Sequence, residues 1–366
     1  MPLAIGSYAG LGALADDADV LNLAWTQDER DLLDVDLMAV VSAELADEVA
    51  SGLPYVNSYL VRDPYGEAAL GPAVAGHFGR AGWSAGTTVG AGVGPLLHCL
   101  STLAPRVHVV SDIYPDFPFW VDKAGGRCVF ADEWDAADPV TPHLRAAADH
   151  DAAVLFLERP GITGDDFADL DRVVALCEGA AERGAVVLVD ESNANYYPPA
   201  YSAVNVVDVV RNLVVVRGLS KAYGLGGLRL GYCVASAALT ESVRSVVPPL
   251  HPSSLSLRIG RRVLDLGDVT SRLRDLVVAR KRDAHAVLAS AGVEPDLQAA
   301  EFLPYLLYTD PQGALERLAA LGIQGKAHPA WSARRGELRH VGRISVPLAD
   351  ARWAELRARC AGERQV

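Results

Sequence analysis

The stretch Val214–Tyr232, VVVRGLSKAYGLGGLRLGY, organises the rest of the chain. Its β-branched run, Val214–Val216, predicts a buried strand. Ser220 and Lys221 follow that strand, then several glycines, and then Arg229 eight positions beyond the lysine. A lysine that ends a buried strand either extends its amine to solvent or does chemistry. The glycines and the second cation favour the chemical interpretation.

The composition is that of a globular protein with an acidic balance. The chain has 366 residues, half of them hydrophobic, which is enough for one large or two smaller domains. It carries 33 Lys and Arg against 46 Asp and Glu, a net charge of −13. This charge argues against nucleic acid or an anionic membrane surface as the main partner, although a local basic pocket for a phosphate is compatible with it.

Cysteine usage and the N-terminal sequence predict a soluble, cytoplasmic protein. The five cysteines are widely spaced and include no C-x-x-C pair, so we expect free thiols and neither a disulfide framework nor a metal site. The N-terminal apolar run ends in Ala-Leu-Ala, but no Lys or Arg precedes it, so we do not expect a signal peptide. No uninterrupted apolar stretch is long enough to span a bilayer.

Strand and helix patterns alternate along the first two thirds of the chain. Helices are expected at 35–50, 66–77 and 169–183, and strands at Val107–Val110, Ala153–Leu157, Val186–Val189 and Leu213–Val216. Alternation of this kind implies right-handed βαβ units and a mainly parallel sheet with helices on both faces. A helical region at 256–292 and strands at Leu303–Tyr308 and Arg343–Val346 predict a smaller α+β domain.

Polar residues follow several of these strands, and ligands of open α/β sheets bind beyond the carboxyl ends of strands. The glycine-rich stretch that begins at Thr88 leads into a helix whose first N–H groups could face an anion, although the stretch taken alone favours a simple tight turn. Tyr114 could stack on a flat ligand or lie in the core. Asp190 ends a buried strand and therefore needs a cationic or hydrogen-bonding partner, unless it caps a helix.

One cofactor, pyridoxal phosphate, would use all of these features together, with a lysine for the Schiff base, an aromatic face, an acid and an anion cradle. The motif Ser220-Lys221-Ala-Tyr-Gly-Leu-Gly-Gly-Leu-Arg229-Leu-Gly resembles the lysine motif of fold-type I pyridoxal-phosphate enzymes. The class I and II aminotransferases are most similar, in particular the histidinol-phosphate aminotransferase-like branch, and the resemblance runs from about Leu21 to Leu356.

The resemblance implies an α/β fold with a large cofactor-binding domain and a smaller α+β domain. The large domain would span residues 36–255 and contain a mainly parallel, mixed sheet. The small domain would combine residues 1–35 with residues 256–366. A homodimer is also implied, in which Tyr59 would reach the phosphate bound by the neighbouring subunit.

The resemblance further implies a set of cofactor contacts, from Val93, Gly94, Tyr114, Asp190, Asn193, Ser220, Lys221 and Arg229. Lys221 would form the Schiff base and then move the proton between the substrate Cα and the cofactor C4′. Arg229, Ser220 and two backbone N–H groups would hold the phosphate. Tyr114 would stack on the ring and Asp190 would pair with its nitrogen. Arg343, not Arg339, is in register with the arginine that grips the substrate's α-carboxylate.

Four positions depart from the family's pattern. Gly161 stands where the family has an asparagine and Asn193 where it has a tyrosine, so two groups that would hold the phenolic oxygen are lost or shortened. Asn193 can still donate one N–H there. Gly218 replaces a usual Ser or Thr, and Pro347 replaces a usual Gly.

The expected function is that of an enzyme that converts an α-amino acid through an external aldimine, most simply an aminotransferase. The alternative is a diverged pyridoxal-phosphate enzyme of specialised metabolism that catalyses elimination or replacement, C–C bond formation or decarboxylation. An NAD-binding oxidoreductase is a remote alternative, because Arg229 stands where G-x-G-x-x-G requires its last glycine. The substrate is not named by the sequence, and Trp25, Tyr196 and Tyr197 are no more than candidate pocket walls.

Overall fold

The computed structural model describes residues 19–362 except 26–28, 60, 81, 84, 134, 136, 165 and 334–335. The apolar N-terminal run considered as a signal peptide lies outside the described residues. Among the helices that are described, none has the length and apolar character needed to cross a membrane. All five cysteines are free thiols.

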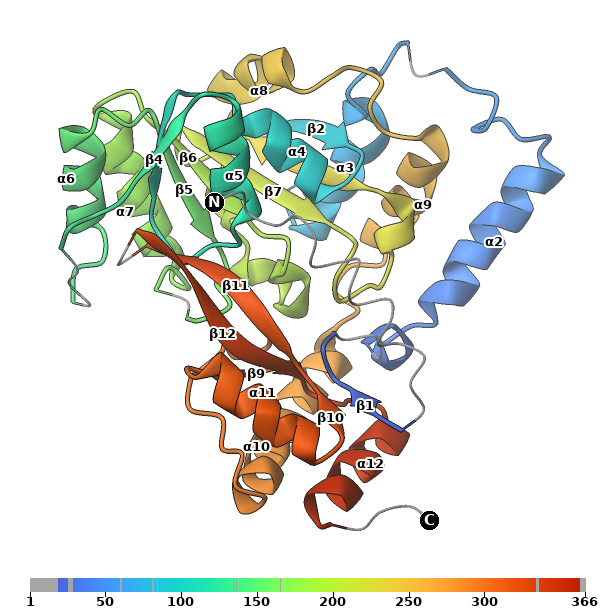
Figure 1. Ribbon diagram of the computed structural model, residues 1–366. Coiled ribbons are helices and arrows are strands. Elements are labelled where there is room, and N and C mark those ends of the chain that lie inside the picture. The colour runs from blue at the N-terminus through green and yellow to red at the C-terminus, as the bar shows by residue number, and fades with distance from the viewer. Residues whose placement is uncertain are drawn as a thin grey trace.

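A seven-stranded sheet forms the centre of the larger part of the molecule (Figure 1). Its strands are β2 (Gly86–Gly90), β3 (Arg106–Val109), β4 (Arg127–Val129), β5 (Val154–Glu158), β6 (Val186–Asp190), β7 (Leu213–Gly218) and β8 (Gly231–Ala235). Their order is β2-β8-β7-β6-β5-β3-β4, and only β8 runs antiparallel to its neighbours. The mainly parallel, mixed sheet is therefore confirmed.

Helices cover both faces of this sheet. They are α3 (Glu67–His77), α4 (Val93–Leu100), α5 (Asp116–Lys123), α6 (Thr141–Asp149), α7 (Leu170–Ala181), α8 (Thr240–Val246) and α9 (Ser254–Leu264). Leu213 and Val215 of β7 belong to the core shared with α3 and α7. Val214 and Val216 belong to the core shared with α4, α5 and α8. A strand buried on both faces carries apolar residues at consecutive positions, which is why Leu213–Val216 of β7 shows no alternation.

A second, smaller sheet lies below the first in Figure 1. It is antiparallel, in the order β11-β12-β9, and consists of β9 (Tyr305–Tyr308), β11 (Lys326–Ser332) and β12 (Glu337–Ser345). Around it lie α10 (Ser271–Ser290), α11 (Pro311–Ala320) and α12 (Asp350–Cys360). A short parallel pair joins β1 (Leu21–Asn22) to β10 (Ile323–Gln324), so the N-terminal segment runs beside the C-terminal part. The domain boundaries at residues 36 and 255 stay a prediction.

The remaining helices agree with the expected pattern. Helix α2 (Leu37–Ala50) matches the helix expected at 35–50. The helical region expected at 256–292 consists of α9 and α10, with a break around Gly267, whose φ of +73° ends a helix without steric strain. Short 3-10 helices complete the chain at Glu29–Leu32, Ala194–Tyr196, Pro199–Tyr201, Ala203–Val206, Gly226–Leu228 and Ala237–Leu239.

The long hairpin β11–β12 connects the two sheets. Figure 1 shows it reaching from the small sheet to the large one. Ile113, in the loop after β3, exchanges two backbone hydrogen bonds with Trp331, at 3.0 and 2.7 Å. Arg339 of β12 forms an ion pair with Asp112 of the same loop. The hairpin is thereby fixed over the carboxyl ends of the large sheet's parallel strands.

Candidate active site

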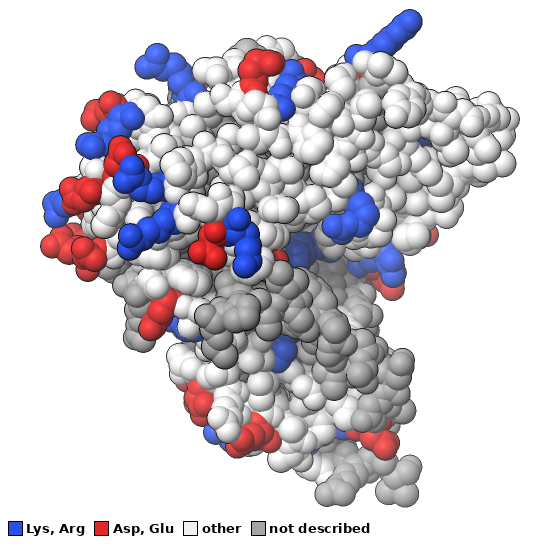
Figure 2. Space-filling model, turned by 45° about the horizontal axis from the view of Figure 1, so that its top comes forward, with Lys and Arg blue, Asp and Glu red and all other residues white. Residues whose placement is uncertain are grey.

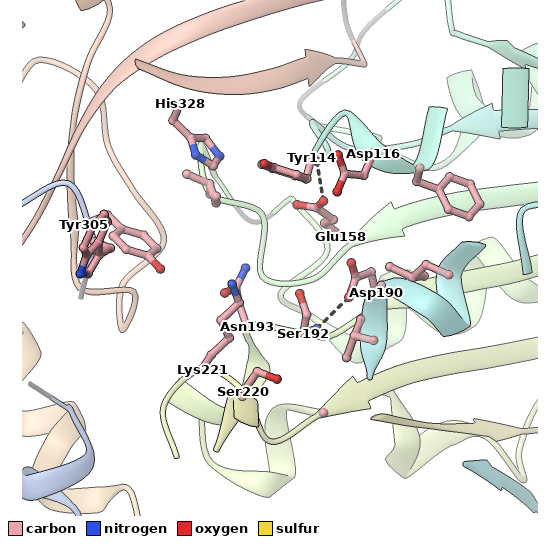
Figure 3. Close-up of a pocket in the computed structure, with 18 of the residues that line it drawn as sticks. Tyr114, Asp116, Glu158, Asp190, Ser192, Asn193, Ser220, Lys221, Tyr305 and His328 are labelled. Atoms are coloured by element: carbon pink, nitrogen blue, oxygen red, sulfur yellow. Dashed lines mark hydrogen bonds between the residues drawn. The ribbon is translucent and has the colours of Figure 1, made fainter. Parts of the chain in front are cut away.

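A cavity of about 900 Å³ lies where the hairpin meets the carboxyl ends of β3, β5, β6 and β7 (Figure 3). All nine residues singled out from the sequence line it, namely Val93, Gly94, Tyr114, Asp190, Asn193, Ser220, Lys221, Arg229 and Arg343. They come from separate parts of the chain, and only the fold brings them together. Tyr59 is not among the lining residues, since its side chain is 79% exposed elsewhere.

An anion-binding corner forms where the first turn of α4 approaches β7. The helix begins at Val93, so its free N–H groups and positive dipole end face the cavity. The Arg229 guanidinium lies at this corner, close to the residue that precedes the helix. A Cβ placed on Gly92 would be only 2.8 Å from Arg229 Nη2. A Cβ on Gly218 would lie 2.6 Å from Val93 Cγ2, so a larger residue at position 218 would require the Val93 side chain to move. The departure at Gly218 is therefore explained by packing.

Two carboxyl groups lie side by side at the ends of β5 and β6, where Glu158 is in register with Asp190. The Asp190 carboxylate accepts the N–H of Ser192 at 2.8 Å, and the Glu158 carboxylate accepts that of Tyr114 (Figure 3). Burial raises the pKa of Asp190 to about 6. Burial, followed by repulsion from Asp190, raises the pKa of Glu158 well above its usual range. Asp190 is thus a buried acid that a cation in the cavity would stabilise.

A fully buried ion network fixes the loop after β6. Glu191 accepts hydrogen bonds from Arg159 Nη1 at 3.0 Å, from the backbone N–H of Ala203 at 2.7 Å, and from Arg217 and Ser202. The guanidinium of Arg159 donates further to three backbone carbonyls, those of Phe167, Ala168 and Tyr201. Since Arg159, Glu191 and Arg217 directly follow or end β5, β6 and β7, the network sets the positions of the strand ends that carry the site.

The hairpin supplies the opposite wall of the cavity. Arg343 of β12 is 6% exposed, lies over the ring of Tyr305 at 4.3 Å, and donates through Nη2 to the carbonyl of Ala24 at 3.1 Å. Its Nε has no hydrogen-bond partner among the described residues. Arg339, by contrast, is engaged with Asp112 outside the cavity lining. Of the two arginines, Arg343 is the one that can meet a carboxylate in the cavity.

Several lining residues were not predicted from the sequence. Lys326 and His328 line the cavity from β11, and Glu158 and Arg30 line it from other segments. The alternation Lys-Ala-His-Pro at the start of β11 places Lys326 and His328 on one face of the strand, but only the pairing with β12 turns that face toward the cavity. Glu158 could have been found from its position at the end of a buried strand, the same signal that revealed Asp190.

The structure corrects the expected pocket walls and explains the glycine at position 161. Tyr196 and Tyr197 are not pocket walls but belong to the hydrophobic core, whereas Trp25 does line the cavity. Gly161 forms a bridge with Gly164, and a Cβ at position 161 would lie 2.6 Å from the Gly164 carbonyl oxygen. The asparagine expected there is thus excluded by this loop conformation, and the neighbouring Ile162 lines the cavity instead.

The arrangement separates three chemical environments within one cavity. An anion corner, a buried acid pair and a cationic wall surround an amine, that of Lys221, next to which Figure 3 shows Asn193. Among the described residues there is no group of His, Cys, Asp and Glu that could hold a metal ion. A phosphorylated aromatic cation fits these environments, because its phosphate would meet the α4 terminus and Arg229 while its ring nitrogen would compensate Asp190.

Comparison with known proteins supports the resemblance inferred from the lysine motif. The sequence model of the family "Aminotransferase class I and II" matches residues 140–321. A histidinol-phosphate aminotransferase of Caldanaerobacter subterraneus is 32% identical over 54% of this chain and 54% of its own length. An aromatic amino acid aminotransferase of Mycolicibacterium vanbaalenii is 29% identical over 57% of this chain and 59% of its own length. The chain thus spans little more than half the length of these curated relatives.

The solved structures extend the likeness to nearly the whole fold. The crystal structure of histidinol-phosphate aminotransferase from Sinorhizobium meliloti in complex with pyridoxal-5'-phosphate has a TM-score of 0.66 and 21% identity. The match covers 87% of this chain and 85% of that one. The chain therefore has the fold of the fold-type I aminotransferases, and its central sequence is related to class I and II aminotransferases.

Proposed function

We propose that this relative of the class I and II aminotransferases is itself a pyridoxal-5'-phosphate-dependent aminotransferase that acts on an α-amino acid. The observation that carries the proposal is the convergence of the nine residues on one cavity, with an amine, an anion corner and a buried acid in one space. The aminotransferase names of its relatives favour amino-group transfer over the elimination, replacement and decarboxylation alternatives.

The residues of the chain divide the work of holding the cofactor. The N–H groups of Val93 and Gly94, together with Ser220 and Arg229, would bind the phosphate. Tyr114 would cover the ring, and Asn193 would donate to its phenolic oxygen. Asp190 would hold the ring nitrogen in its protonated form. When bound, pyridoxal phosphate supplies an electron sink for negative charge at the substrate Cα.

Two residues would then act on the substrate. The Lys221 amine would hold the cofactor covalently, and it is the group that would move a proton between the substrate Cα and C4′. Arg343 would hold the α-carboxylate, for which its buried Nε and its fixed position over Tyr305 suit it. Orientation of the amino acid by a guanidinium fork keeps Cα within reach of the amine.

The cofactor assignment is tested by absorbance. Purified protein supplied with pyridoxal phosphate should be yellow, and Lys221→Ala should lose the absorbance of the lysine adduct because no amine is left to form it. Wild-type protein that stays colourless after reconstitution would refute the assignment. Mass spectrometry of products from an amino-acid panel then decides the reaction, since transfer yields a keto acid without loss of carbon dioxide or of a side-chain group.

The functional unit proposed is a homodimer. Support comes from exposed apolar side chains on α2 and the segment that follows it, with Leu250 nearby in the fold: Met38, Leu45, Val49, Leu53, Tyr55, Val56, Tyr59, Val61 and Leu250. Figure 1 shows α2 standing at the edge of the molecule. Exposed apolar surface of this extent marks an interaction site. Within such a dimer, Tyr59 would approach the neighbouring subunit's phosphate, and Tyr59→Phe should weaken cofactor binding.

A cytoplasmic location is part of the same proposal. It is supported by five free thiols, two of them buried, because reducing compartments keep cysteines in this form. Fractionation of cells that express the full chain, with detection of the protein outside the cytoplasm, would contradict it.

A further inference from the structure

The cationic wall of the cavity contains more positive charge than one α-carboxylate requires. Lys326 of β11 lies directly opposite Arg343 of β12 in the antiparallel register, and both line the cavity. Side chains of directly opposed residues start about 5 Å apart and point to the same face. Two cations are thus fixed side by side on the hairpin, in addition to the amine of Lys221.

Lys326 is a partly buried basic residue for which no counter-charge is described. The described residues offer its amine neither an ion pair nor a hydrogen bond. Elsewhere, the half-buried amine of Lys281 donates to four backbone carbonyls, and Arg258 pairs with three carboxylates. A partly buried ammonium without a partner is unfavourable, and it persists where a ligand supplies the counter-charge.

The surroundings of Lys326 reinforce this interpretation. The pKa of Lys326 is lowered to about 7, first by burial and then by the positive charges of Arg343 and Lys221. No acid is among the groups that shift this pKa. His328 lies two residues along the same strand face, 3% exposed, and its buried Nδ1 has no partner in the described part of the chain. Burial and the same cations lower the pKa of His328, so its ring is neutral and can donate one N–H.

We propose that Lys326 forms a second anion subsite, so that the preferred substrate is an α-amino acid whose side chain carries a carboxylate, phosphate or phosphonate group. Arg343 binds the α-carboxylate, while Lys326 meets the distal anion beside the imidazole of His328. That the ligand is an amino acid rests on the proposed function. That the ligand carries two anionic groups does not. Lys326 is accordingly a specificity-determining residue.

The test measures binding of acids that cannot react. Isothermal titration calorimetry on the protein reconstituted with pyridoxal phosphate compares butyrate, which has one carboxylate, with glutarate and 3-phosphonopropionate, which have two anionic groups. Wild-type protein should bind at least one of the two-anion probes about tenfold more tightly than butyrate, and the preferred probe identifies the distal group. Tenfold corresponds to about 1.4 kcal/mol.

Three variants make the result specific. Lys326→Met should reduce the two-anion probes to the affinity of butyrate, with butyrate itself unchanged, and Lys326→Arg should retain the preference. Lys123→Met, in which a lysine of α5 outside the cavity lining is removed, is the control and should behave as wild type. Melting curves establish that each variant is folded.

Two outcomes would overturn the subsite. Equal weakening of butyrate and glutarate by Lys326→Met would mean that Lys326 only assists Arg343 on a single carboxylate. Absence of a two-anion preference in wild-type protein would exclude the second anion altogether. Failure of the proposed function is seen separately, as absence of the yellow cofactor adduct, and the same titrations on cofactor-free protein would still test the anion pair.

Discussion

Asp190 illustrates how one residue is held in an unfavourable state until a ligand arrives. Its carboxylate is 7% exposed, has Glu158 beside it, and accepts hydrogen bonds from the backbone N–H and the side chain of Ser192. A buried carboxylate in these surroundings resists ionisation, which is why its pKa rises to about 6. The protonated ring nitrogen of the proposed cofactor would provide the missing positive charge.

This burial predicts a pH dependence of stability in the cofactor-free protein. Between pH 3.8 and about 6 the unfolded chain ionises Asp190 whereas the folded chain does not, so rising pH favours unfolding. A pKa rise from 3.8 to about 6 corresponds to at most about 3 kcal/mol. The free energy of unfolding of wild type, relative to Asp190→Asn, should therefore fall between pH 4 and 7 in urea titrations. A difference that stays constant with pH would show that Asp190 ionises normally in the folded state.

At the level of elements, the ends of three neighbouring strands are joined by one carboxylate. Glu191 connects Arg159, which follows β5, with Arg217 of β7, and neither guanidinium is more than 2% exposed. Removal of one partner leaves an uncompensated buried charge, which typically destabilises a protein by about 3–5 kcal/mol. The shape of the cavity depends on this ion network, because the lining residues Glu158, Asp190 and Gly218 end the three strands that the network joins.

Glu191→Gln should therefore lower the free energy of unfolding by about 3–5 kcal/mol, since the amide keeps the volume but loses the charge that balances two guanidinium groups. Chemical denaturation followed by circular dichroism measures the change. Glu182→Gln, at the exposed end of α7, is the matched control and should shift stability by no more than about 0.5 kcal/mol. Equal stability of the two variants would mean that the network contributes no more than surface charge does.

The elements also show what the sequence could and could not reveal. Strands β5, β6 and β7 were predictable because each is an apolar run followed by a polar residue, a signal local to a few positions. The orientation of Lys326 was not predictable, because it depends on the pairing of β11 with β12 and on the docking of Trp331 against Ile113, more than 200 positions away in the chain. Tyr196 and Tyr197 were misassigned for the same reason, since nothing local distinguishes a core tyrosine from one that lines a pocket.

On the scale of the whole molecule, charge is distributed unevenly. The chain has a net charge of −13, yet in its cavity the basic residues Arg30, Lys221, Arg229, Lys326 and Arg343 outnumber the acids Asp116, Glu158 and Asp190. Figure 2 shows Lys and Arg side chains, with some Asp and Glu among them, along the junction between the upper and lower parts of the molecule. A cleft in which basic groups outnumber acidic ones attracts anionic ligands, even when the net charge of the protein repels them. The acidic surface and the basic cavity are thus compatible with a small anionic substrate.

The edge formed by α2 and the following segment gives the prediction that concerns the assembly. Val49 and Val56 are 68% and 57% exposed, and they would be buried if a second copy packed there. Val49→Glu combined with Val56→Glu would place two charges in that interface, so light scattering should show dimers for wild type and monomers for the double variant. Val209→Glu, at a position 64% exposed outside this region, is the control and should remain dimeric. Because Tyr59 would reach the neighbouring subunit's phosphate, the monomeric variant should also bind pyridoxal phosphate more weakly than the control. Wild-type protein that is monomeric at micromolar concentration would contradict the dimer. A double variant that stays dimeric would show that the interface does not involve Val49 and Val56.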